Sequence, residues 1–482
     1  MDSILAIDQG TSATKCVLVD RTGAIVARGS APLDETHPQT GWVEQDPEAL
    51  WVSVQRAVAD CLRDQDAHRV AAIGIASQRE SLVAWDRASG AALAPLVSWQ
   101  DQRGAAICDR LRDAATEALV RARSGLPLDP MFSAAKATAL LDALDPQRER
   151  ARAGAIALGT VDAWLLHRLA GPAAAPVTEI GNASRTQLLD VRGGGWDPRL
   201  LELFGVPRAA MPDVVASTGP FPAARGLAPL PNGVPVLAVM GDSHAALYAH
   251  GVRAPGQVKA TYGTGSSVMG LLAGAEDAGG GVCLTIAWQE TAIAFAAEGN
   301  VRATGATVRW LAGLLGATPD AVAAMAAESD SGGVVLVPGF NGLGAPYWDR
   351  EAVGLAAGLR LDTGPRQLAR AALDSIVHQV ADVAEAMGSV DALFADGGAS
   401  RNDALMQMQA DVLGCTVLRA RDAELSALGV AHLAGRQAEI WDEAALAAMP
   451  RPRDRFAPKL APEARAAARA EWRRAVARAR SG

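Results

Sequence analysis

The segment AIDQGTSATK, residues 6–15, decides the fold class. The apolar run Ile4–Ile7 leads into a turn at residues 8–12, and a second apolar run, Cys16–Val19, follows it. Two short apolar runs joined by a glycine-containing turn predict a β-hairpin. The turn offers small residues, backbone N–H groups and two hydroxyls, which are the groups that bind a phosphate at a backbone turn.

Two further turns of the same kind occur later, TYGTGSS at residues 261–267 and DGGAS at residues 396–400. Each follows a predicted strand, Val258–Tyr262 in one case and a strand from Ala392 in the other. An ordinary tight turn explains any one of them, but three in this order favour a phosphate site. The sequence has neither a GxxxxGK[ST] loop nor a GxGxxG that follows a strand. Nucleotide binding is therefore expected to be spread over three turns.

Strands and helices alternate along the chain. A helix is predicted at Pro47–Leu62, with Asp46 as its cap and proline in its first turn, and a buried strand follows at Val70–Ala76. Later, Val334–Val337 is predicted as a strand and Gly364–Met387 as a long helix. Interleaved strands and helices predict an α/β protein.

The length of 482 residues is too great for one hydrophobic core and fits two or three domains. Glycine and proline interrupt the pattern near residues 245–257, which predicts a hinge there. We therefore expect one domain at 1–247 and a second at 248–482, with a helical tail from about residue 440. The tail from Arg451 is rich in alanine and arginine, and its positive charges are interpreted as a solvated helix face.

Composition excludes several classes of protein. Half of the residues are apolar and a fifth are charged, which describes a folded globular chain. The net charge of −8 gives no field that attracts nucleic acid or an anionic membrane, so neither is an expected partner. From the sequence pattern we expect neither a signal peptide nor a membrane-spanning run. The cysteines lack the spacing of zinc ligands and are interpreted as reduced thiols of a cytoplasmic protein. They are Cys16, Cys61, Cys108, Cys283 and Cys415.

Asp242 is the candidate general base. It follows a predicted buried strand, Val234–Met240, and a glycine, where a carboxylate can accept the proton of an attacking hydroxyl. The structural alternative is a helix-capping aspartate, because a helical segment begins just after it. His244 lies nearby, but a single histidine beside a helix start is more often structural than catalytic.

Arg79, Glu80 and Trp99 form a second group of candidate ligand-binding residues. Arg79 and Glu80 follow the strand Val70–Ala76 and are expected to form a buried charged pair, which is costly unless it has a function or excellent partners. Trp99 is expected to supply an apolar wall. The alternatives are a purely structural ion pair and a core tryptophan.

Sequence blocks over nearly the whole chain resemble the FGGY carbohydrate kinase family, most closely its glycerol kinase branch. They are AIDQGTSATK (6–15), GWVEQDPEALW (41–51), SQRESLVAWD (77–86), SWQDQR (98–103), GTVDAWLLHRL (159–169), GNASRTQLLD (181–190), GDSHAALY (241–248), TYGTG (261–265), PGFNGLGAPYWD (338–349) and DGGASRNDALMQMQADVLG (396–414).

The resemblance implies two RNase H-like domains of the actin/hexokinase type that flank a catalytic cleft. The implied activity is transfer of a phosphoryl group from ATP to a hydroxyl of a small polyol or sugar, with Mg²⁺ as the metal. ATP is expected mainly on the second domain and the acceptor on the first. Relatives in the family make a homodimer or a homotetramer an expected assembly.

The resemblance also implies which residues bind the nucleotide and metal. Asp8 is implied to help hold Mg²⁺ through water. Lys15 is implied to face the phosphates, and its structural alternative is a surface residue of the strand. Arg309 stands where relatives usually carry glutamine near the nucleotide. The residues implied to contact ATP are Thr11, Ser12, Lys15, Thr264, Gly305, Arg309, Gly398 and Asn402.

The acceptor pocket departs from the glycerol kinase pattern at three positions. Met131 replaces a usual tyrosine, Ser243 replaces the glutamine after the base, and Ser267 replaces an aromatic residue. Smaller groups predict a wider pocket and a four- or five-carbon polyol or ketose as acceptor. A xylulokinase-like pentulose kinase is the alternative, although such kinases usually carry a Gln-Met-His turn where this chain has Gln-Arg-Glu.

The resemblance also bears on regulation and on whether the protein is an active enzyme. The loop at residues 230–233 lacks the Gly-Gly-Thr-Arg that binds a sugar bisphosphate in some glycerol kinases, so no inhibition by fructose bisphosphate is expected. A nucleotide-driven switch of the actin or chaperone type would share the phosphate turns but has no need of Arg79, Glu80, Trp99 and Asp242. The presence of both Asp8 and Asp242 disfavours an inactive kinase-like protein.

Overall fold

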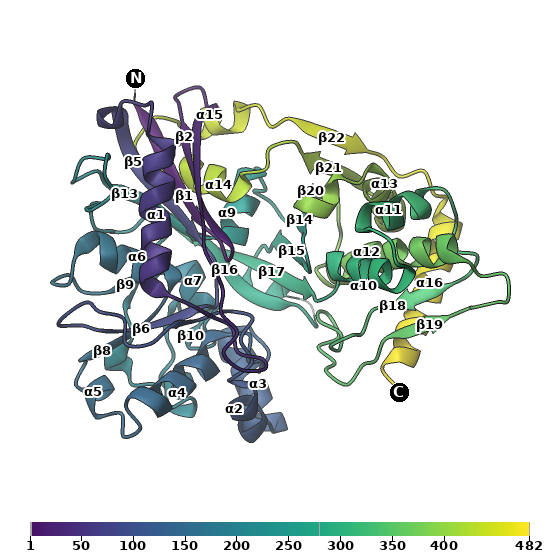
Figure 1. Ribbon diagram of the computed structural model, residues 1–482, viewed down its shortest axis with the longest axis horizontal. Coiled ribbons are helices and arrows are strands. Elements are labelled where there is room, and N and C mark those ends of the chain that lie inside the picture. Colours follow the sequence, from purple (N-terminus) through teal and green to yellow (C-terminus); the bar gives the residue numbers. More distant parts are fainter. Residues whose placement is uncertain (1, 279, 482) are drawn as a thin grey trace. The chain divides into compact units, whose positions relative to one another are not determined.

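The computed structural model describes residues 2–278 and 280–481, which gather in two compact units (Figure 1). Unit 1 comprises Met1–Gly251, Leu284–Phe295 and Glu424–Pro450, and unit 2 comprises Val252–Cys283, Ala296–Ala423 and Arg451–Gly482. Both units are built from separate stretches of chain. The division into domains at 1–247 and 248–482 stays a prediction. By packing, residues 284–295 and 424–450 belong to the same unit as the N-terminal part of the chain.

The central sheet of unit 1 has the strand order β13-β5-β1-β2-β3. Strands β1 and β2 pair antiparallel, with Asp8 opposite Lys15, so the predicted hairpin is confirmed. Strands β5 and β13 run parallel to β1, and Ser77 of β5 lies opposite Gln9 on one side and Gly241 on the other. The residues that follow these three strands therefore meet at one edge of the sheet. The bounds are β1 Ser3–Gln9, β2 Ala13–Val19, β3 Ile25–Pro32, β5 Val70–Ser77 and β13 Val236–Gly241.

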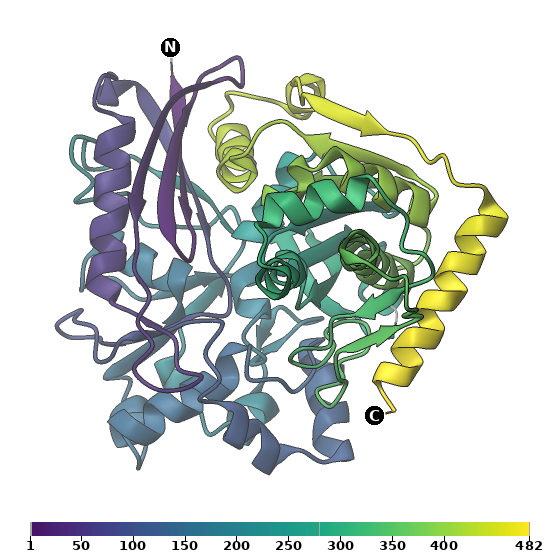
Figure 2. The ribbon, with the colours of Figure 1, turned by 45° about the vertical axis from the view of Figure 1, so that its right-hand side comes forward.

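Helices cover this sheet from segments that are far apart in sequence. Helix α1 (Pro47–Cys61) packs on β2 and β3, and α14 (Leu425–Gln437) packs on β1, β5 and β13. Figure 2 shows the purple strands between these two helices. Helix α14 also lies against α9 (Asp242–Ala249), where Gly429 allows close approach because a Cβ there would lie 1.8 Å from the carbonyl oxygen of Ala245. The segment 424–450 thus completes unit 1.

Unit 1 also contains a four-stranded sheet with the order β4-β7-β6-β8. Its strands are β4 Glu44–Gln45, β6 Leu82–Asp86, β7 Leu96–Val97 and β8 Ile156–Thr160, with short strands β9 Val177–Glu179, β10 Leu189–Asp190, β11 Gly195–Trp196 and β12 Asp213–Val215 nearby in the chain. The remaining helices of unit 1 are η1 Ala67–Arg69, α2 Ala105–Leu111, α3 Ala114–Ser124, α4 Ser133–Leu144, α5 Glu149–Arg152, α6 Val161–Ala170, α7 Ile180–Ser184, α8 Pro198–Leu203, η2 Arg208–Ala210 and α15 Glu443–Ala448.

Unit 2 has a sheet in which β17, β15, β14, β20, β21 and β22 follow one another. Strands β14 and β15 form an antiparallel hairpin, and β20 runs parallel to β14 with Asp396 opposite Thr261. The turns that follow β14 and β20 therefore lie at the same edge of this sheet. The bounds are β14 Gln257–Tyr262, β15 Ser266–Leu271, β16 Cys283–Gln289, β17 Ile293–Val301, β20 Ala392–Asp396, β21 Thr416–Ala420 and β22 Arg453–Phe456.

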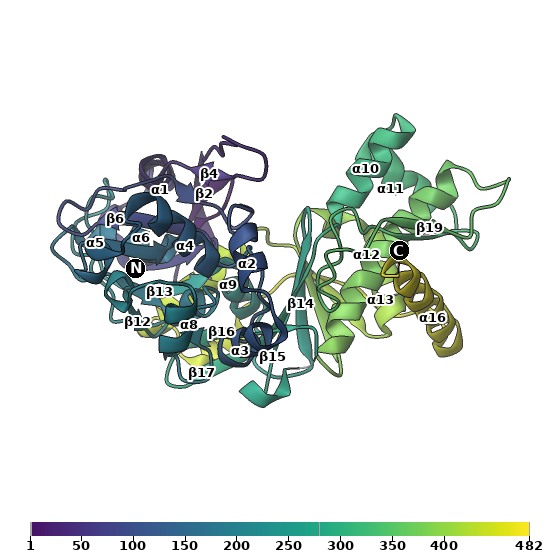
Figure 3. The same ribbon diagram turned by 90° about the horizontal axis from the view of Figure 1, so that it is seen from below.

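The helices of unit 2 pack around the long helix α12 (Figure 3). Helix α12, Pro365–Ala386, and strand β18, Val335–Val337, confirm the elements predicted at 364–387 and 334–337. The buried side of α12 contributes much of the core of this unit. The other elements are η3 Ala275–Asp277, α10 Gly305–Leu315, α11 Pro319–Ala327, β19 Leu355–Ala357, η4 Gly398–Arg401, α13 Asp403–Leu413 and α16 Pro462–Ala479.

The C-terminal tail differs from the helical tail expected from about residue 440. Strand β22 interrupts it and pairs antiparallel with β21. Arg469 of α16 is not solvated, because it is 4% exposed and donates to Asp382 at 2.6 Å and to Glu385 at 2.8 Å. Trp472 donates to the same Asp382 at 2.7 Å. The alanine-arginine composition gives no sign that one side of this helix is buried. The interpretation of the positive charges as a solvated helix face is therefore wrong for Arg469.

Within residues 2–278 and 280–481, no single helix has the length and hydropathy needed to cross a membrane. The bent pair α10 and α11 passes this test by length and composition alone.

Candidate active site

Two carboxylates face the edge of the unit 1 sheet. Asp8 lies near the end of β1, and Asp242 is the first residue of α9, directly after β13. Burial and, to a smaller extent, the negative charge of Asp242 together raise the pKa of Asp8 to about 7, while Lys15 acts in the opposite direction. The two side chains are therefore close enough to repel each other, as β1 and β13 on either side of β5 require.

Asp242 is anchored but accessible. Its Oδ1 accepts a hydrogen bond from the backbone N–H of Ser243 at 2.6 Å and lies 3.3 Å from Nε of Arg79. The side chain is 36% exposed, so it can reach a ligand. The residue in the capping position is Gly241, and Asp242 stands in the first turn, where the helix dipole favours a negative charge. Asp242 is therefore not the helix-capping residue, and the structural alternative does not explain its position.

Arg79 is buried beside Asp242 and His244. Its Nη1 lies 3.3 Å from Nε2 of His244, whose ring is fully buried. Gly241 makes room for this side chain, because a Cβ there would lie 2.5 Å from Cδ of Arg79. His244 thus contacts the arginine and does not face the surface, which agrees with a structural interpretation of this histidine.

Glu80 does not pair with Arg79, so the predicted charged pair is wrong. Its carboxylate accepts a hydrogen bond from Nε of Arg185 at 2.6 Å, and Arg185 is fully buried. Sequence reasoning missed Arg185 because it lies 105 residues from Glu80. The sequence feature that could have pointed to Arg185 is its position in the block GNASRTQLLD, residues 181–190, which resembles the family. Both predicted residues are buried, as expected, but each has a different partner.

Trp99 connects the acceptor candidates to the phosphate hairpin. Its indole Nε1 donates to the hydroxyl of Thr11 at 3.0 Å, and its backbone N–H donates to the hydroxyl of Ser81 at 2.9 Å. The residue is 37% exposed, which excludes a core tryptophan. Ser12, next to Thr11, is exposed on the same turn. The geometry leaves the tryptophan ring available as an apolar wall.

Lys15 is exposed and forms an ion pair with Glu424 at 3.2 Å. Glu424 belongs to the returning segment of unit 1, and it precedes α14. The sequence offered no signal for this pair, since the two residues are far apart in the chain. Lys15 is therefore a surface lysine with a defined partner at the hairpin that carries Asp8.

Met131 and Ser243 are half-buried. The backbone N–H of Met131 donates to Asp129 at 2.9 Å, which fixes the loop before α4. The backbone N–H of Ser243 is the donor to Asp242 described above. Both positions that depart from the glycerol kinase pattern in unit 1 thus lie on fixed backbone.

The Gly-Thr-Gly turn of unit 2 contacts the start of α10. The N–H of Gly305 donates to the carbonyl of Gly263 at 3.0 Å, and the N–H of Ala306 donates to the carbonyl of Thr264 at 3.1 Å. Two of the predicted phosphate residues, Thr264 and Gly305, are therefore neighbours. Arg309 lies one turn further along α10.

The remaining predicted residues of unit 2 have local partners. The hydroxyl of Ser267 donates to the buried carboxylate of Glu298 at 3.1 Å. The side-chain oxygen of Asn402 caps α13 by accepting from Leu405 at 3.0 Å. Gly398 begins η4 after β20, and a Cβ there would meet open space. The third phosphate turn thus has room next to its backbone.

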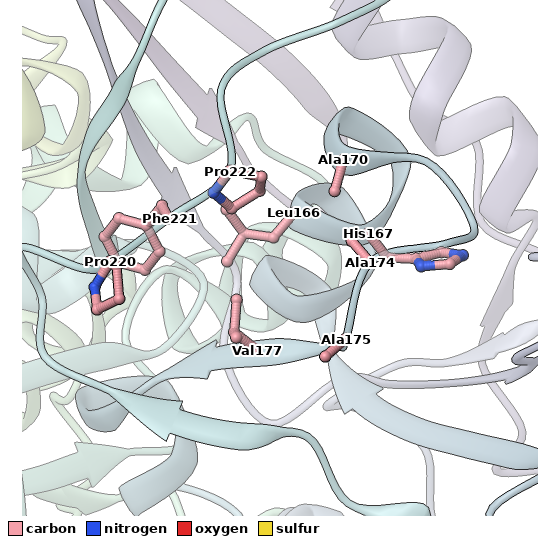
Figure 4. A pocket seen from close by; sticks show the side chains of 9 residues that line it. All are labelled: Leu166, His167, Ala170, Ala174, Ala175, Val177, Pro220, Phe221 and Pro222. Atoms are coloured by element: carbon pink, nitrogen blue, oxygen red, sulfur yellow. The ribbon is translucent and has the colours of Figure 1, made fainter.

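A pocket of about 210 Å³ lies elsewhere in unit 1, and none of the predicted site residues, all within the described chain, lines it (Figure 4). Apolar side chains from α6, β9 and the loop before β13 form most of its wall. The lining residues are Leu166, His167, Ala170, Ala174, Ala175, Val177, Pro220, Phe221 and Pro222. We do not assign the acceptor to this pocket. Among the described residues, no group of three or more histidine, cysteine, aspartate or glutamate side chains is placed to hold a metal ion by itself.

Comparisons with known proteins identify the family of this chain. The N-terminal domain model of the FGGY family of carbohydrate kinases matches residues 3–249, and the C-terminal domain model matches residues 258–438. An apulose kinase of Pectobacterium atrosepticum is 42% identical over 99% of this chain and 98% of its own length. A glycerol kinase of Aromatoleum aromaticum is 42% identical over 100% of this chain and 99% of its own.

Solved structures give the same result for the fold. The structure of Plasmodium falciparum glycerol kinase with ADP has a TM-score of 0.91 and 25% identity, and the alignment covers 99% of this chain and 98% of that one. A xylulose kinase of Lactobacillus acidophilus has a TM-score of 0.86 at 19% identity, with 99% and 97% covered, and supports the fold alone. The chain belongs to the FGGY family of carbohydrate kinases and is a kinase of a small sugar or polyol.

Proposed function

We propose that this kinase transfers the γ-phosphoryl group of ATP to a hydroxyl of a four- or five-carbon polyol or ketose, with Asp242 as the general base. The observation that supports this most strongly is the state of Asp242. Its carboxylate is accessible, is held by Arg79 and the Ser243 N–H, and lies near the carboxylate of Asp8. A base must be fixed and able to reach the proton that it accepts.

The proposed chemistry of unit 1 uses three side chains around that base. Asp242 accepts the proton of the acceptor hydroxyl as the hydroxyl attacks phosphorus, and Arg79 keeps the carboxylate oriented. Glu80 and Arg79 hold the other hydroxyls, and the exposed ring of Trp99 contacts the carbon chain. Phosphoryl transfer depends chiefly on positioning and charge neutralisation, which agrees with a site made of fixed polar groups.

The residues present fit a magnesium ion that arrives with ATP. Asp8 lies beside a second carboxylate and its pKa is raised to about 7, so a divalent cation nearby would relieve the repulsion. Two carboxylates without a third ligand suit Mg²⁺, which usually keeps several waters and takes other ligands from substrate phosphates. When bound, Mg²⁺ supplies charge neutralisation on the phosphoryl oxygens. We assign its contact on this chain to Asp8, through water.

The proposed nucleotide residues of unit 2 lie on the edge where β14 and β20 end. Thr264 and Gly305 would line the phosphates with backbone N–H groups, and Gly398 and Asn402 would hold the nucleoside. Arg309 replaces a glutamine of relatives and adds a positive charge one turn into α10. Thr11, Ser12 and Lys15 of unit 1 would contact the terminal phosphate in the reacting complex.

The choice of acceptor depends on single positions of the site. The apulose kinase and the glycerol kinase named above are equally similar to this chain, so overall identity does not choose between acceptors. Local differences do. Met131, Ser243 and Ser267 replace larger or amide side chains of the glycerol kinase pattern. Discrimination between substrates through hydroxyl contacts can reach ~10⁴–10⁵-fold, because a wrong ligand leaves buried polar groups unpaired. We therefore propose that glycerol is not the preferred acceptor.

The proposal includes the setting of the enzyme. All five cysteines are free and buried, as expected for a cytoplasmic protein. A homodimer or homotetramer is proposed by analogy with the family, and absence of inhibition by fructose bisphosphate follows from the loop at residues 230–233.

An acceptor panel tests the proposed function. ADP release is measured with glycerol, erythritol, dihydroxyacetone, xylulose, ribulose and apulose at equal concentrations, with an acceptor-free control. We expect the highest kcat/KM with a four- or five-carbon compound. Efficient turnover of glycerol alone would refute the proposed acceptor class, and no release above the control with any compound would refute the function.

A further inference from the structure

Glu80 has an unusual backbone conformation. Its φ of 63° lies in the left-handed region, which a residue with a side chain rarely adopts. The N–H of Ser81 donates to the carbonyl of Arg79 at 2.8 Å across this residue, so the turn is tight. Such a conformation persists only when its surroundings hold it, and it is common at ligand sites.

A buried lysine contacts this turn. Lys136 of α4 is 0% exposed, and its ammonium donates to the carbonyl of Glu80 at 3.5 Å and to the carbonyl of Met131 over a short distance. The hydroxyl of Ser133 donates to the same Glu80 carbonyl at 2.9 Å. Lys136 thus joins the turn that carries Arg79 and Glu80 to the loop that carries Met131.

The charge of Lys136 is unfavourable for folding. Burial lowers the pKa of this lysine from 10.5 to about 8, against the opposing effects of Glu80, Asp101, Asp129 and the thiol of Cys108. Between pH 8 and 10.5 the unfolded chain therefore holds a proton that the folded chain has lost, so the charged lysine destabilises the fold below pH 8. A purely stabilising role does not explain its position.

We propose that Lys136 is a positioning residue of the acceptor site. Its protonated ammonium fixes the Glu80 turn relative to Met131, and acceptor affinity depends on that charge. The inference rests on the proposed function of Arg79, Glu80 and Met131 as acceptor residues. Unlike those three residues, Lys136 does not touch the substrate and acts through the backbone that carries them.

Lys136→Met tests this role, because methionine keeps an unbranched chain without the donor. Acceptor binding is measured by isothermal titration calorimetry without ATP, using the compound of the panel that the wild type binds best. We expect the acceptor Kd and KM to rise by about 10- to 100-fold, the range for losing hydrogen bonds from a charged group. The expected kcat and ATP affinity stay within about 3-fold of wild type, and Tm at pH 7 does not fall. The control is Lys459→Met, which removes an exposed lysine.

The pH profile separates positioning from packing. In the wild type the acceptor Kd is expected to rise as the pH passes about 8, where Lys136 loses its proton. In Lys136→Met the Kd is expected to be high and independent of pH between 7 and 9.5. A rise that persists in Lys136→Met would assign the titration to another group, such as Cys108, and would overturn the proposal.

Other outcomes are equally decisive. An unchanged Kd in Lys136→Met overturns the positioning role, and so does a loss of ATP binding together with a lower Tm, which indicates a structural lysine. If the wild type binds an acceptor but releases no ADP, the proposed function fails while Lys136 is still tested by Kd. If it binds no acceptor of the panel, both proposals fail.

Discussion

Asp8 and Asp242 are two neighbouring carboxylates whose repulsion destabilises the ligand-free protein and favours binding of a cation. Burial and the neighbouring carboxylate raise the pKa of Asp8, so a proton or a cation is favoured at this position. Arg79 contacts Asp242 on the other side, which keeps that carboxylate oriented. Asp8 is therefore the carboxylate whose negative charge is less well compensated, and the metal contact is proposed there.

This asymmetry predicts a pH-dependent stability effect of Asp8→Asn. The folded pKa of about 7 is above the usual 3.8, so the folded chain holds the extra proton between these values and loses stability as the pH rises from 4 to 7. Asp8→Asn should therefore raise Tm by an amount that grows over this range and levels off above pH 7, at about 2–4 °C for each kcal/mol regained. Kinase activity should fall.

Thermal unfolding of the ligand-free protein at pH 4, 5, 6, 7 and 8 measures this effect. Asp64→Asn is the matched control, because Asp64 is exposed in the same unit. A Tm difference that does not change with pH would show that Asp8 is not the destabilised carboxylate.

At the scale of elements, α9 and α14 determine the position of Asp242, the proposed base. Helix α9 begins at Asp242, and α14 packs against it through Gly429. The main-chain atoms of Ala245 occupy the space that a side chain at this glycine would need. The position of Asp242, the proposed base, thus depends on a helix from the returning segment of the chain.

Gly429→Ala should therefore affect both stability and catalysis. The added methyl group would overlap main-chain atoms, and overpacking of this kind typically costs about 1–3 kcal/mol. We expect a lower urea midpoint and a lower kcat, since α9 must shift. Gly313→Ala in α10 is the control, because its Cβ would meet open space and alanine favours a helix. Equal effects of the two variants would contradict the role of this contact.

Local pattern explains what the sequence predicted at this scale. The hairpin at residues 6–15, the strand at 70–76 and the helix at 364–387 follow from periodicity, turns and caps, and each is present. The partners of charged groups were not predictable in this way. Glu80 with Arg185, and Lys15 with Glu424, connect residues that only the complete fold brings together. The pair expected between Arg79 and Glu80 failed because adjacent residues in a tight turn point in different directions.

At the scale of the whole molecule, neither compact unit is a continuous half of the chain. Helix α14 covers the sheet of unit 1 although it comes after most of unit 2 in sequence, and α16 completes unit 2 from the C-terminal end. A boundary inferred from glycine and proline near residue 250 cannot reveal such returns, because the later segments carry ordinary helical patterns.

A fragment of residues 1–251 should consequently fail to fold stably. Without α14, the apolar face of β1, β5 and β13 would be exposed. We expect strong binding of the dye ANS and no cooperative thermal transition, as in states that lack fixed packing. A fragment in which residues 424–450 are joined to 1–251 is the comparison and should show a recovered transition. A cooperative, dye-free transition of residues 1–251 alone would contradict the role of the returning segment.

The most direct test of the account is the rate of phosphoryl transfer in Asp242→Asn. Asparagine keeps the shape of the side chain and removes its basic oxygen, so the protein should fold and bind ATP and acceptor with affinities close to wild type. In rapid-quench single turnover with the best acceptor, we expect the rate to fall at least ~10²-fold. A rate near that of the wild type would show that Asp242 is not the base and would contradict the proposed mechanism.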